Sequence, residues 1–238
     1  MENTVRLSPG ALLYAVLRLR KSGIYGLLDV FSALPDAEFP TCLQNAEHEL
    51  LQMGCGRMNF DGDFSLSQEF ADLVSACADE TSVLQVDRRL QHRQQRLTCY
   101  LHAGAALVQD GGDCLLCNRV VLPGAVLEFL ALPADCQNLR PAVVDAALLA
   151  EKNRAGLVAA GCTEPLADLL IAAAAGDGGY AQLVRIVNKR QTALAALAWG
   201  PAGTVGVEVD YTTGVERLRV CPLTAEEAGT QIAALTAL

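Results

Sequence analysis

Three histidines and nine cysteines are the first side chains of this chain to consider as nucleophiles, general bases or metal ligands. Cys99 and His102 could form a nucleophile–base pair, but no orienting acid and no oxyanion-hole motif accompanies them. His48 lies on the polar face of an expected helix, and His92 lies in a charged turn. The sequence therefore predicts no catalytic residues, and we expect a protein that is not an enzyme.

Cys114 and Cys117 have the spacing of one half of a zinc site. A structural zinc site brings a second close pair of Cys or His ligands, and the sequence offers none. Two leucines separate the cysteines, so a buried strand explains this pattern better than a metal or redox site. The glycine-rich stretches 111–112 and 176–179 lack the strand-to-helix context and the lysine of a phosphate-binding loop. We expect no metal and no cofactor.

A group of cations is the remaining candidate for function. Four arginines surround an expected β-turn next to His92, and two further cations occupy the matching turn of a later, similar region. In an acidic chain these cations could dock an acidic or helical partner, although a solvated turn is the simpler interpretation. The only tryptophan ends an expected strand and could lie at an interface or in the core. The candidate partner-binding residues are Arg88, Arg89, Arg93, Arg96, Lys189, Arg190 and Trp199.

Two regions with the same order of elements would position these residues. An expected helix over 67–77 and another over 163–173 share the tripeptide Ala-Asp-Leu. The apolar pattern after each helix predicts four strands joined by tight turns, and each meander runs into a proline and a final helix. The expected strands are 83–89, 96–102, 105–109 and 114–120 in the first region, and 183–188, 192–199, 204–210 and 215–220 in the second.

Further helices are expected ahead of both regions. Ser8 followed by a proline is typical of a helix start, and the short apolar segment 24–31 is expected to be helical. Apolar spacing predicts a helix over 41–54, and the similar segment 141–161 is expected to be its helical counterpart. The last helix, from Thr224, begins with a capping box.

An Asp-Gly pair at 61–62 predicts a hairpin turn between two helices. The region 41–78 could therefore form a winged helix in a transcriptional or signalling domain, which is the alternative function. The order of the helices and the absence of a basic recognition helix argue against that alternative.

The expected fold class is α+β. We expect two pseudo-duplicated units, each a helix–helix–four-strand antiparallel meander–helix, packed with quasi-twofold symmetry into one compact body. The N-terminal half covers 1–135, including the extra N-terminal helices, and the C-terminal half covers 136–238. The link over 133–141 is short and lacks the composition of a flexible tether, and helices should cover the apolar face of each unit's sheet.

The composition limits the partners and the compartment. A formal net charge of −9 and a pI near 4.8 argue against a surface for nucleic acid or anionic membrane. No apolar run approaches bilayer length, and the N-terminus lacks the pattern of a signal peptide. The odd number of cysteines, mostly inside apolar patterns, indicates buried thiols in a reducing compartment; examples are Cys42, Cys77, Cys99 and Cys162. We expect a cytoplasmic protein with no nucleic-acid partner and no direct membrane insertion.

The order and sequence of these elements resemble the EspG-like chaperones of type VII (ESX) secretion. The resemblance rests on Leu-Ser-Pro-Gly-Ala-Leu-Leu at 7–13, Leu-Leu-Gln-Met-Gly at 50–54, the helix over 70–77, Val-Leu-Gln-Val at 83–86 and the Leu-Pro helix start at 122–123. It spans nearly the whole chain, as a pattern without a diagnostic motif.

The resemblance implies a cytosolic adaptor that binds helical secretion substrates, shields their aggregation-prone tip and hands them to the secretion machinery. It transfers no catalytic residues, and it makes a helical secreted protein the expected client, with the oligomeric state left open. The tight turn at 103–105 leaves little room for a long binding hairpin. A protein of this kind should expose an apolar patch and should have no deep polar pocket.

Overall fold

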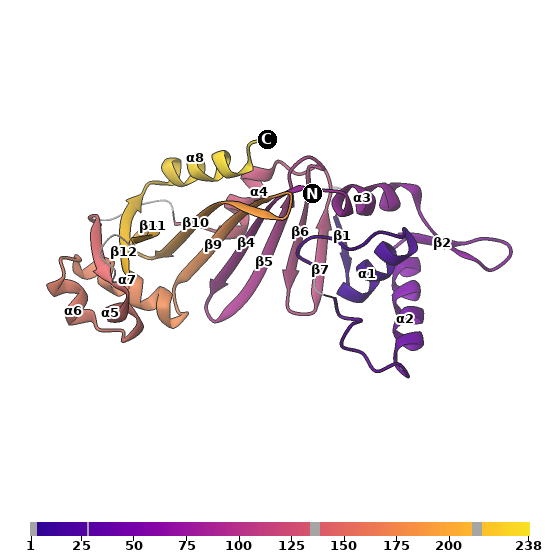
Figure 1. Cartoon of the computed structure of the whole chain (residues 1–238), viewed down its shortest axis with the longest axis horizontal. Coiled ribbons are helices and arrows are strands. Elements are labelled where there is room, and N and C mark those ends of the chain that lie inside the picture. The colour runs from indigo at the N-terminus through magenta and orange to yellow at the C-terminus, as the bar shows by residue number, and fades with distance from the viewer. Residues whose placement is uncertain (1–3, 28, 134–138, 211–215) are drawn as a thin grey trace.

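The computed structural model describes residues 4–27, 29–133, 139–210 and 216–238. Within these residues it contains one ten-stranded antiparallel sheet, a separate two-stranded hairpin and eight helices (Figure 1). The α+β class expected from the sequence is confirmed.

The large sheet has a regular strand order. From one edge to the other the strands are β1 (Thr4–Leu7), β7 (Asp113–Cys117), β6 (Ala105–Asp110), β5 (Arg93–Tyr100), β4 (Ser82–Leu90), β9 (Gly179–Val187), β10 (Arg190–Gly200), β11 (Gly203–Asp210), β12 (Arg217–Leu223) and β8 (Ala142–Asp145). The two predicted meanders are confirmed, with strand ends shifted by up to four residues; position 215 lies outside the described residues. From the central β4–β9 pair, strands β5, β6 and β7 follow in chain order toward one edge, and β10, β11 and β12 follow in chain order toward the other.

The structure has one continuous sheet where the sequence suggested one sheet for each unit. Strands β4 and β9 pair in an unbroken antiparallel register from Ser82↔Val187 to Arg89↔Tyr180. Each of these strands is the first of its meander and would otherwise expose a row of unpaired backbone groups. Their pairing removes both free edges and fuses the two meanders.

Two short edge strands were not expected. β1 pairs with β7, and β8 pairs with β12. At four residues each, they are too short for a clear alternation of apolar and polar side chains. The prediction of a helix over 141–161 is wrong at its start, because β8 comes first and two short helices follow.

The two short helices, α5 (Ala146–Ala150) and α6 (Arg154–Ala159), have separate N-caps. The side chain of Asp145 accepts a hydrogen bond from the N–H of Ala147, and the side chain of Asn153 accepts one from the N–H of Gly156. Lys152, between the helices, has a positive φ of 54° that interrupts the helical path.

The expected helix over 24–31 is also wrong. Gly26 has a φ of +82°, outside the right-handed helical region. The side chain of Asp29 accepts hydrogen bonds from the N–H groups of Phe31 and Ser32, which holds the chain in a turn. Position 28 lies outside the described residues.

The longer helices cover both faces of the sheet. α1 (Pro9–Arg18), α2 (Phe39–Gln52) and α3 (Gln68–Ala78) form a core with β4 to β7, and α7 (Glu164–Ala175) forms another with β10 to β12. On the opposite face, α4 (Leu122–Leu130) and α8 (Ala225–Thr236) pack over the centre of the sheet. Figure 1 shows α5, α6 and α7 at one end of the molecule and α1, α2 and α3 at the other.

The predicted helix starts and the buried cysteines are largely confirmed. The hydroxyl of Ser8 accepts a hydrogen bond from the N–H of Ala11, and Thr224 and Glu227 form the predicted capping box. The eight described cysteines are free thiols and six are buried, but Cys42 is only partly buried, contrary to expectation.

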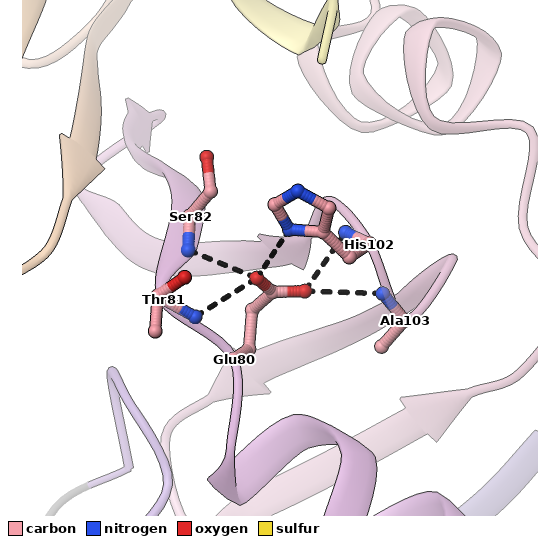
Figure 2. A network of polar contacts seen from close by, with 5 residues as sticks. All are labelled: Glu80, Thr81, Ser82, His102 and Ala103. Carbon is pink, nitrogen blue, oxygen red and sulfur yellow. Dashed lines mark hydrogen bonds and ion pairs between the residues drawn. The ribbon is translucent and has the colours of Figure 1, made fainter.

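Glu80 fastens the start of β4 to the turn that follows β5 (Figure 2). The side chain is 2% exposed, and its carboxylate accepts backbone hydrogen bonds of 2.8–3.0 Å from Thr81, Ser82, His102 and Ala103. The ring Nδ1 of His102 lies 2.8 Å from the same carboxylate. Burial alone would raise the pKa of Glu80. The hydrogen bonds from His102 and the backbone together lower the pKa by more than burial raises it, so this pKa lies below its ordinary value.

Replacing Glu80 with Gln should lower the free energy of unfolding by about 2–4 kcal/mol, because the buried N–H donors lose a charged acceptor. Since the folded-state pKa is lowered, the stabilisation is complete above the unfolded-state pKa of about 4.3 and is lost as the pH falls through the folded-state pKa. Urea unfolding at several pH values measures both effects.

The matched control is His102→Gln, which removes only the exposed partner and should cost less than about 1 kcal/mol. A loss of stability in E80Q that does not exceed the loss in H102Q would contradict the assigned role of Glu80.

Candidate docking surface

The two faces of the sheet divide the predicted arginine cluster. Side chains alternate along a strand, so Arg88 and Arg89 of β4 point to opposite faces. Directly paired residues share a face, which places Arg96 on the face of Arg89 and places Arg93 on the face of Arg88. The cluster is therefore not a single cationic surface.

A concave surface lies on the Arg89 face, between the N-terminus of α1 and helix α7. One part of it is polar, has a volume of about 490 Å³ and is lined by residues that include Pro9, Asp87, Gln94, Arg96 and Gln109. The other part is mainly apolar, has a volume of about 530 Å³ and is lined by residues that include Leu170, Leu194, Ala196, Val207, Val209 and Leu218. Arg89, Tyr180 and Gln182 line both parts, so the two are continuous. We call this surface the sheet groove.

Arg89 holds the end of α7 against the sheet. Its Nη2 donates hydrogen bonds to the carbonyl oxygens of Ala173 at 2.6 Å and Ala174 at 3.4 Å. These carbonyls belong to the last turn of α7, where the helix dipole favours a cation. The guanidinium carbon also lies 6.0 Å from the centroid of the Tyr180 ring. Arg89 thus fixes the boundary between the polar and the apolar parts of the groove.

Arg96 is paired within the groove. Its Nε lies 2.6 Å from Oδ1 of Asp87, and Nε2 of Gln85 donates to the other carboxylate oxygen at 2.7 Å. The polar part of the groove is therefore a mixed surface of amides and an ion pair.

On the opposite face, Arg88 and Arg93 also have partners. Arg88 donates to the carbonyl of Phe129 and to the side chain of Gln95, and its guanidinium lies 4.5 Å from the centroid of the Phe129 ring. Arg93 donates to both carboxylate oxygens of Asp110. These two arginines join strands and helix α4 of the same half.

Lys189 and Arg190 lie far from the arginines. They follow β9 at the end of the sheet where Val187 pairs with Ser82, whereas Arg89 pairs with Tyr180 at the other end. Seven residues of strand separate these ends, which is about 23 Å at about 3.3 Å per residue. As predicted, these cations lie at the turn after the first strand of the second meander, as Gln91 and His92 do in the first. Because β4 and β9 are antiparallel, the two turns lie at opposite ends of this strand pair.

Trp199 lies inside the protein. It is 4% exposed and belongs to the core beneath α4 and α8. A Cβ atom on Gly179, its neighbour on β9, would lie 2.0 Å from Cε2 of the indole. Of the two alternatives left open for this tryptophan, burial in the core is the observed one.

No pattern in the sequence indicated the apolar side chains that are exposed in the groove. Leu194 is 52% exposed and Val209 is 43% exposed. The alternation of Val205, Val207 and Val209 correctly predicted a strand with one apolar face, but it could not show that α7 covers only the start of that face. The expected exposed apolar patch is present.

The histidines and cysteines that could act as nucleophiles, bases or metal ligands do not converge on one site. Burial raises the pKa of Cys99 to about 12, which leaves it a neutral thiol, while His102 contacts Glu80. His48 and His92 are exposed. Cys114 lies in the core on β7, as predicted for a buried strand. In the described parts of the chain, no three His, Cys, Asp or Glu side chains are grouped as metal ligands, and no helix has the length and apolarity to cross a membrane.

The candidate site is thus a groove on a broad sheet that is framed by helices. No protein family and no curated protein matches the sequence. Among solved structures the chain is similar to the type VII secretion system chaperone EspG5 of Mycobacterium tuberculosis, determined in complex with the PE25–PPE41 dimer. The identity is 11%, the TM-score is 0.63, and the match covers 98% of this chain and 95% of EspG5. The fold implied by the sequence resemblance is confirmed over nearly the whole chain.

The contact between Gly179 and Trp199 gives a direct test of the core beneath the groove. Gly179→Ala should force the indole to move and should lower the free energy of unfolding by about 1–3 kcal/mol, because the added methyl overpacks this site. Trp199 is the only tryptophan, so its fluorescence and near-UV circular dichroism report the displacement.

Gly124→Ala, where an added Cβ has no atom within 4 Å, is the control. It should leave the tryptophan signal unchanged and should not lower the stability, because alanine is favoured over glycine in helix α4. An unchanged tryptophan spectrum in G179A would show that the packing described here is wrong.

Proposed function

We propose that this protein is a cytosolic, non-enzymatic chaperone or adaptor that binds a helical secreted protein in the sheet groove. The observation that carries the proposal is the exposure of Leu194 and Val209 on the apolar side of a concave surface. Apolar side chains gathered on a hollow surface favour a protein partner. We assign no catalytic residue: His102 contacts Glu80, and within the described chain no three His, Cys, Asp or Glu side chains are grouped as metal ligands.

The dimensions of the groove suit a helical client. The groove runs from Gln109 on β6 to Leu218 on β12, across six strand spacings. At about 4.8 Å per spacing this distance is about 29 Å. One helix with its side chains is about 10–12 Å across, so the groove has room for one helix or the tip of a helical pair.

The polarity of the groove also favours an amphipathic helix. A client helix could place its apolar face over Leu194 and Val209 and its polar flank over the amides and the Asp87–Arg96 pair. EspG5, which shares this fold, is described as a chaperone and was solved with a PE25–PPE41 dimer. That similarity supports a protein client of the same kind for this chain.

The candidate residues have different parts in this proposal. Arg89 and Arg96 line the groove and would contact the client directly. Trp199 would act only by supporting the sheet from the other face. Arg88 also lines the polar part of the groove, whereas contacts to Arg93, Lys189 and Arg190 require a partner that extends beyond the groove.

The winged-helix alternative requires a basic helix beside the hairpin at 56–66, and neither flanking helix is basic. The flanking helices α2 and α3 contain no lysine or arginine. A recognition helix that enters DNA needs cations to contact the phosphates. We therefore propose no nucleic-acid partner.

We also propose that 1–135 and 136–238 are duplicated units of one compact body. The matching strand order on both sides of β4–β9, and the positive φ of the turn residues in both first hairpins, support this proposal; these residues are Gln91, His92, Asn188 and Lys189. Expressed separately, each half should aggregate because β4 or β9 becomes an open edge. Two monomeric, independently folded halves would instead favour separate domains.

The groove can be tested with a pair of matched variants. Val209→Asn in the groove should raise the dissociation constant of the client complex about tenfold, because it places a polar amide against the client's apolar face. The client is identified by purifying the tagged protein from its own cells, and the affinity is then measured with both purified proteins.

The control is Val143→Asn on β8, where the valine is 44% exposed, as Val209 is at 43%, but lies outside the groove. V143N should bind the client as the unchanged protein does. Equal affinities for V209N and V143N would reject the groove as the client site. A stoichiometric partner without helices would reject the proposal of a helical client.

A further inference from the structure

The hairpin between α2 and α3 has no part in the proposed client site. Its strands are β2 (Gly56–Met58) and β3 (Phe64–Leu66), which pair only with each other. In Figure 1 it projects from the end of the molecule formed by α1, α2 and α3, away from the strands that carry Leu194 and Val209.

The base of the hairpin is fixed to the body. Phe64 is buried, and its ring lies 5.8 Å from that of Tyr14 between centroids. Arg18 donates from Nη2 to the Phe64 carbonyl at 2.6 Å and places its guanidinium 5.6 Å from the Phe64 ring centroid. A Cβ on Gly56 would lie 2.3 Å from the same ring, so only glycine allows this close approach.

The tip of the hairpin is also ordered. Oδ1 of Asn59 accepts hydrogen bonds from the N–H groups of Asp61 at 3.1 Å and Asp63 at 2.7 Å. Gly62 adopts a φ of +82°, which suits glycine in this turn. These bonds hold the backbone so that the side chain between Asn59 and Asp61 points away from the protein.

That side chain is Phe60, whose relative exposure of 110% is the highest among the exposed large apolar residues of the described chain. Met58, which is about half exposed, lines the same shallow depression as Phe60. Aromatic side chains and methionine are enriched at the centres of protein interfaces. A tip that is already ordered loses little conformational entropy on binding, which favours affinity.

Two carboxylates set the chemistry of the partner. Asp61 and Asp63 follow Phe60 in the turn, and within the described residues neither forms an ion pair. Arg57 lines the same depression, so the charged side chains around Phe60 are two carboxylates and one cation. A partner with cations around an apolar socket complements this net negative charge. Anionic membrane does not, because the two carboxylates and the net charge of −9 oppose it.

We propose that Phe60 is the anchor of a second docking site, which binds a protein with an apolar socket rimmed by lysine and arginine. This site is separate from the sheet groove and allows the protein to hold two partners at once. It does not depend on the proposed client, because the hairpin and the groove share no residue.

The test begins with a photo-cross-linking phenylalanine analogue at position 60 of the full chain in its own cells. The adduct should contain a protein other than the groove client, and it is identified by mass spectrometry. The affinity of the purified partner is then measured for the unchanged chain, F60A, D61N/D63N and V209N at two salt concentrations.

F60A should weaken binding at least tenfold, because it removes the anchor without touching the core. D61N/D63N should weaken binding about threefold or more and should reduce its dependence on salt. V209N should bind this partner normally. Circular dichroism should show each variant to be folded.

Several outcomes would overturn the proposal. These are the absence of any adduct, an adduct only with a second copy of this chain, or a partner that F60A binds as well as the unchanged chain does. If V209N also failed to bind this partner, the hairpin and the groove would belong to one site and not to two. If the unchanged chain sedimented with anionic vesicles and F60A did not, the partner of Phe60 would be a lipid surface and not a protein.

Discussion

The pairing of β4 with β9 is the interaction on which the arrangement of the molecule depends. Eight consecutive residue pairs join the first strands of the two meanders, so that neither strand remains an open edge. This register determines which side chains of the two halves become neighbours. It brings Arg89 beside Tyr180, and from there Arg89 reaches the last carbonyl groups of α7. The helices of each half are thereby positioned around a shared sheet.

The groove is a consequence of that junction. The core of α1 and α3 includes the Val83 end of β4, while α7 packs over Ala198 and Val205. Between these helices the sheet keeps an uncovered strip, with polar side chains on β4 and β5 and apolar ones on β10 and β11. The opposite face is closed by α4 and α8. The two faces therefore differ: α4 and α8 cover the centre of one face, whereas the centre of the other stays exposed between the core of α1 to α3 and the core of α7.

Local patterns in the sequence were enough for most elements but not for their assembly. The capping residues Ser8 and Thr224 and the alternating valines of β11 act over a few residues, and the elements they predict are present. Four-residue β8 carries too little pattern, and it forms because β12 is available beside it. The arginines looked like one cluster because turns were matched along the chain, whereas strand alternation and the reversed direction of β9 separate them. Exposure of Leu194 depends on where α7 ends, which no local pattern reveals.

The central strand pair also has a consequence for synthesis of the protein. β4 ends at Leu90, but its partner is complete only at Val187, so nearly a hundred residues must be added before the middle of the sheet can close. Contacts so distant along the chain form slowly, and an unpaired strand can meet other chains in the meantime. A nascent N-terminal half leaving the ribosome would therefore need protection until β9 emerges. A protein proposed to shield others would itself pass through a vulnerable stage.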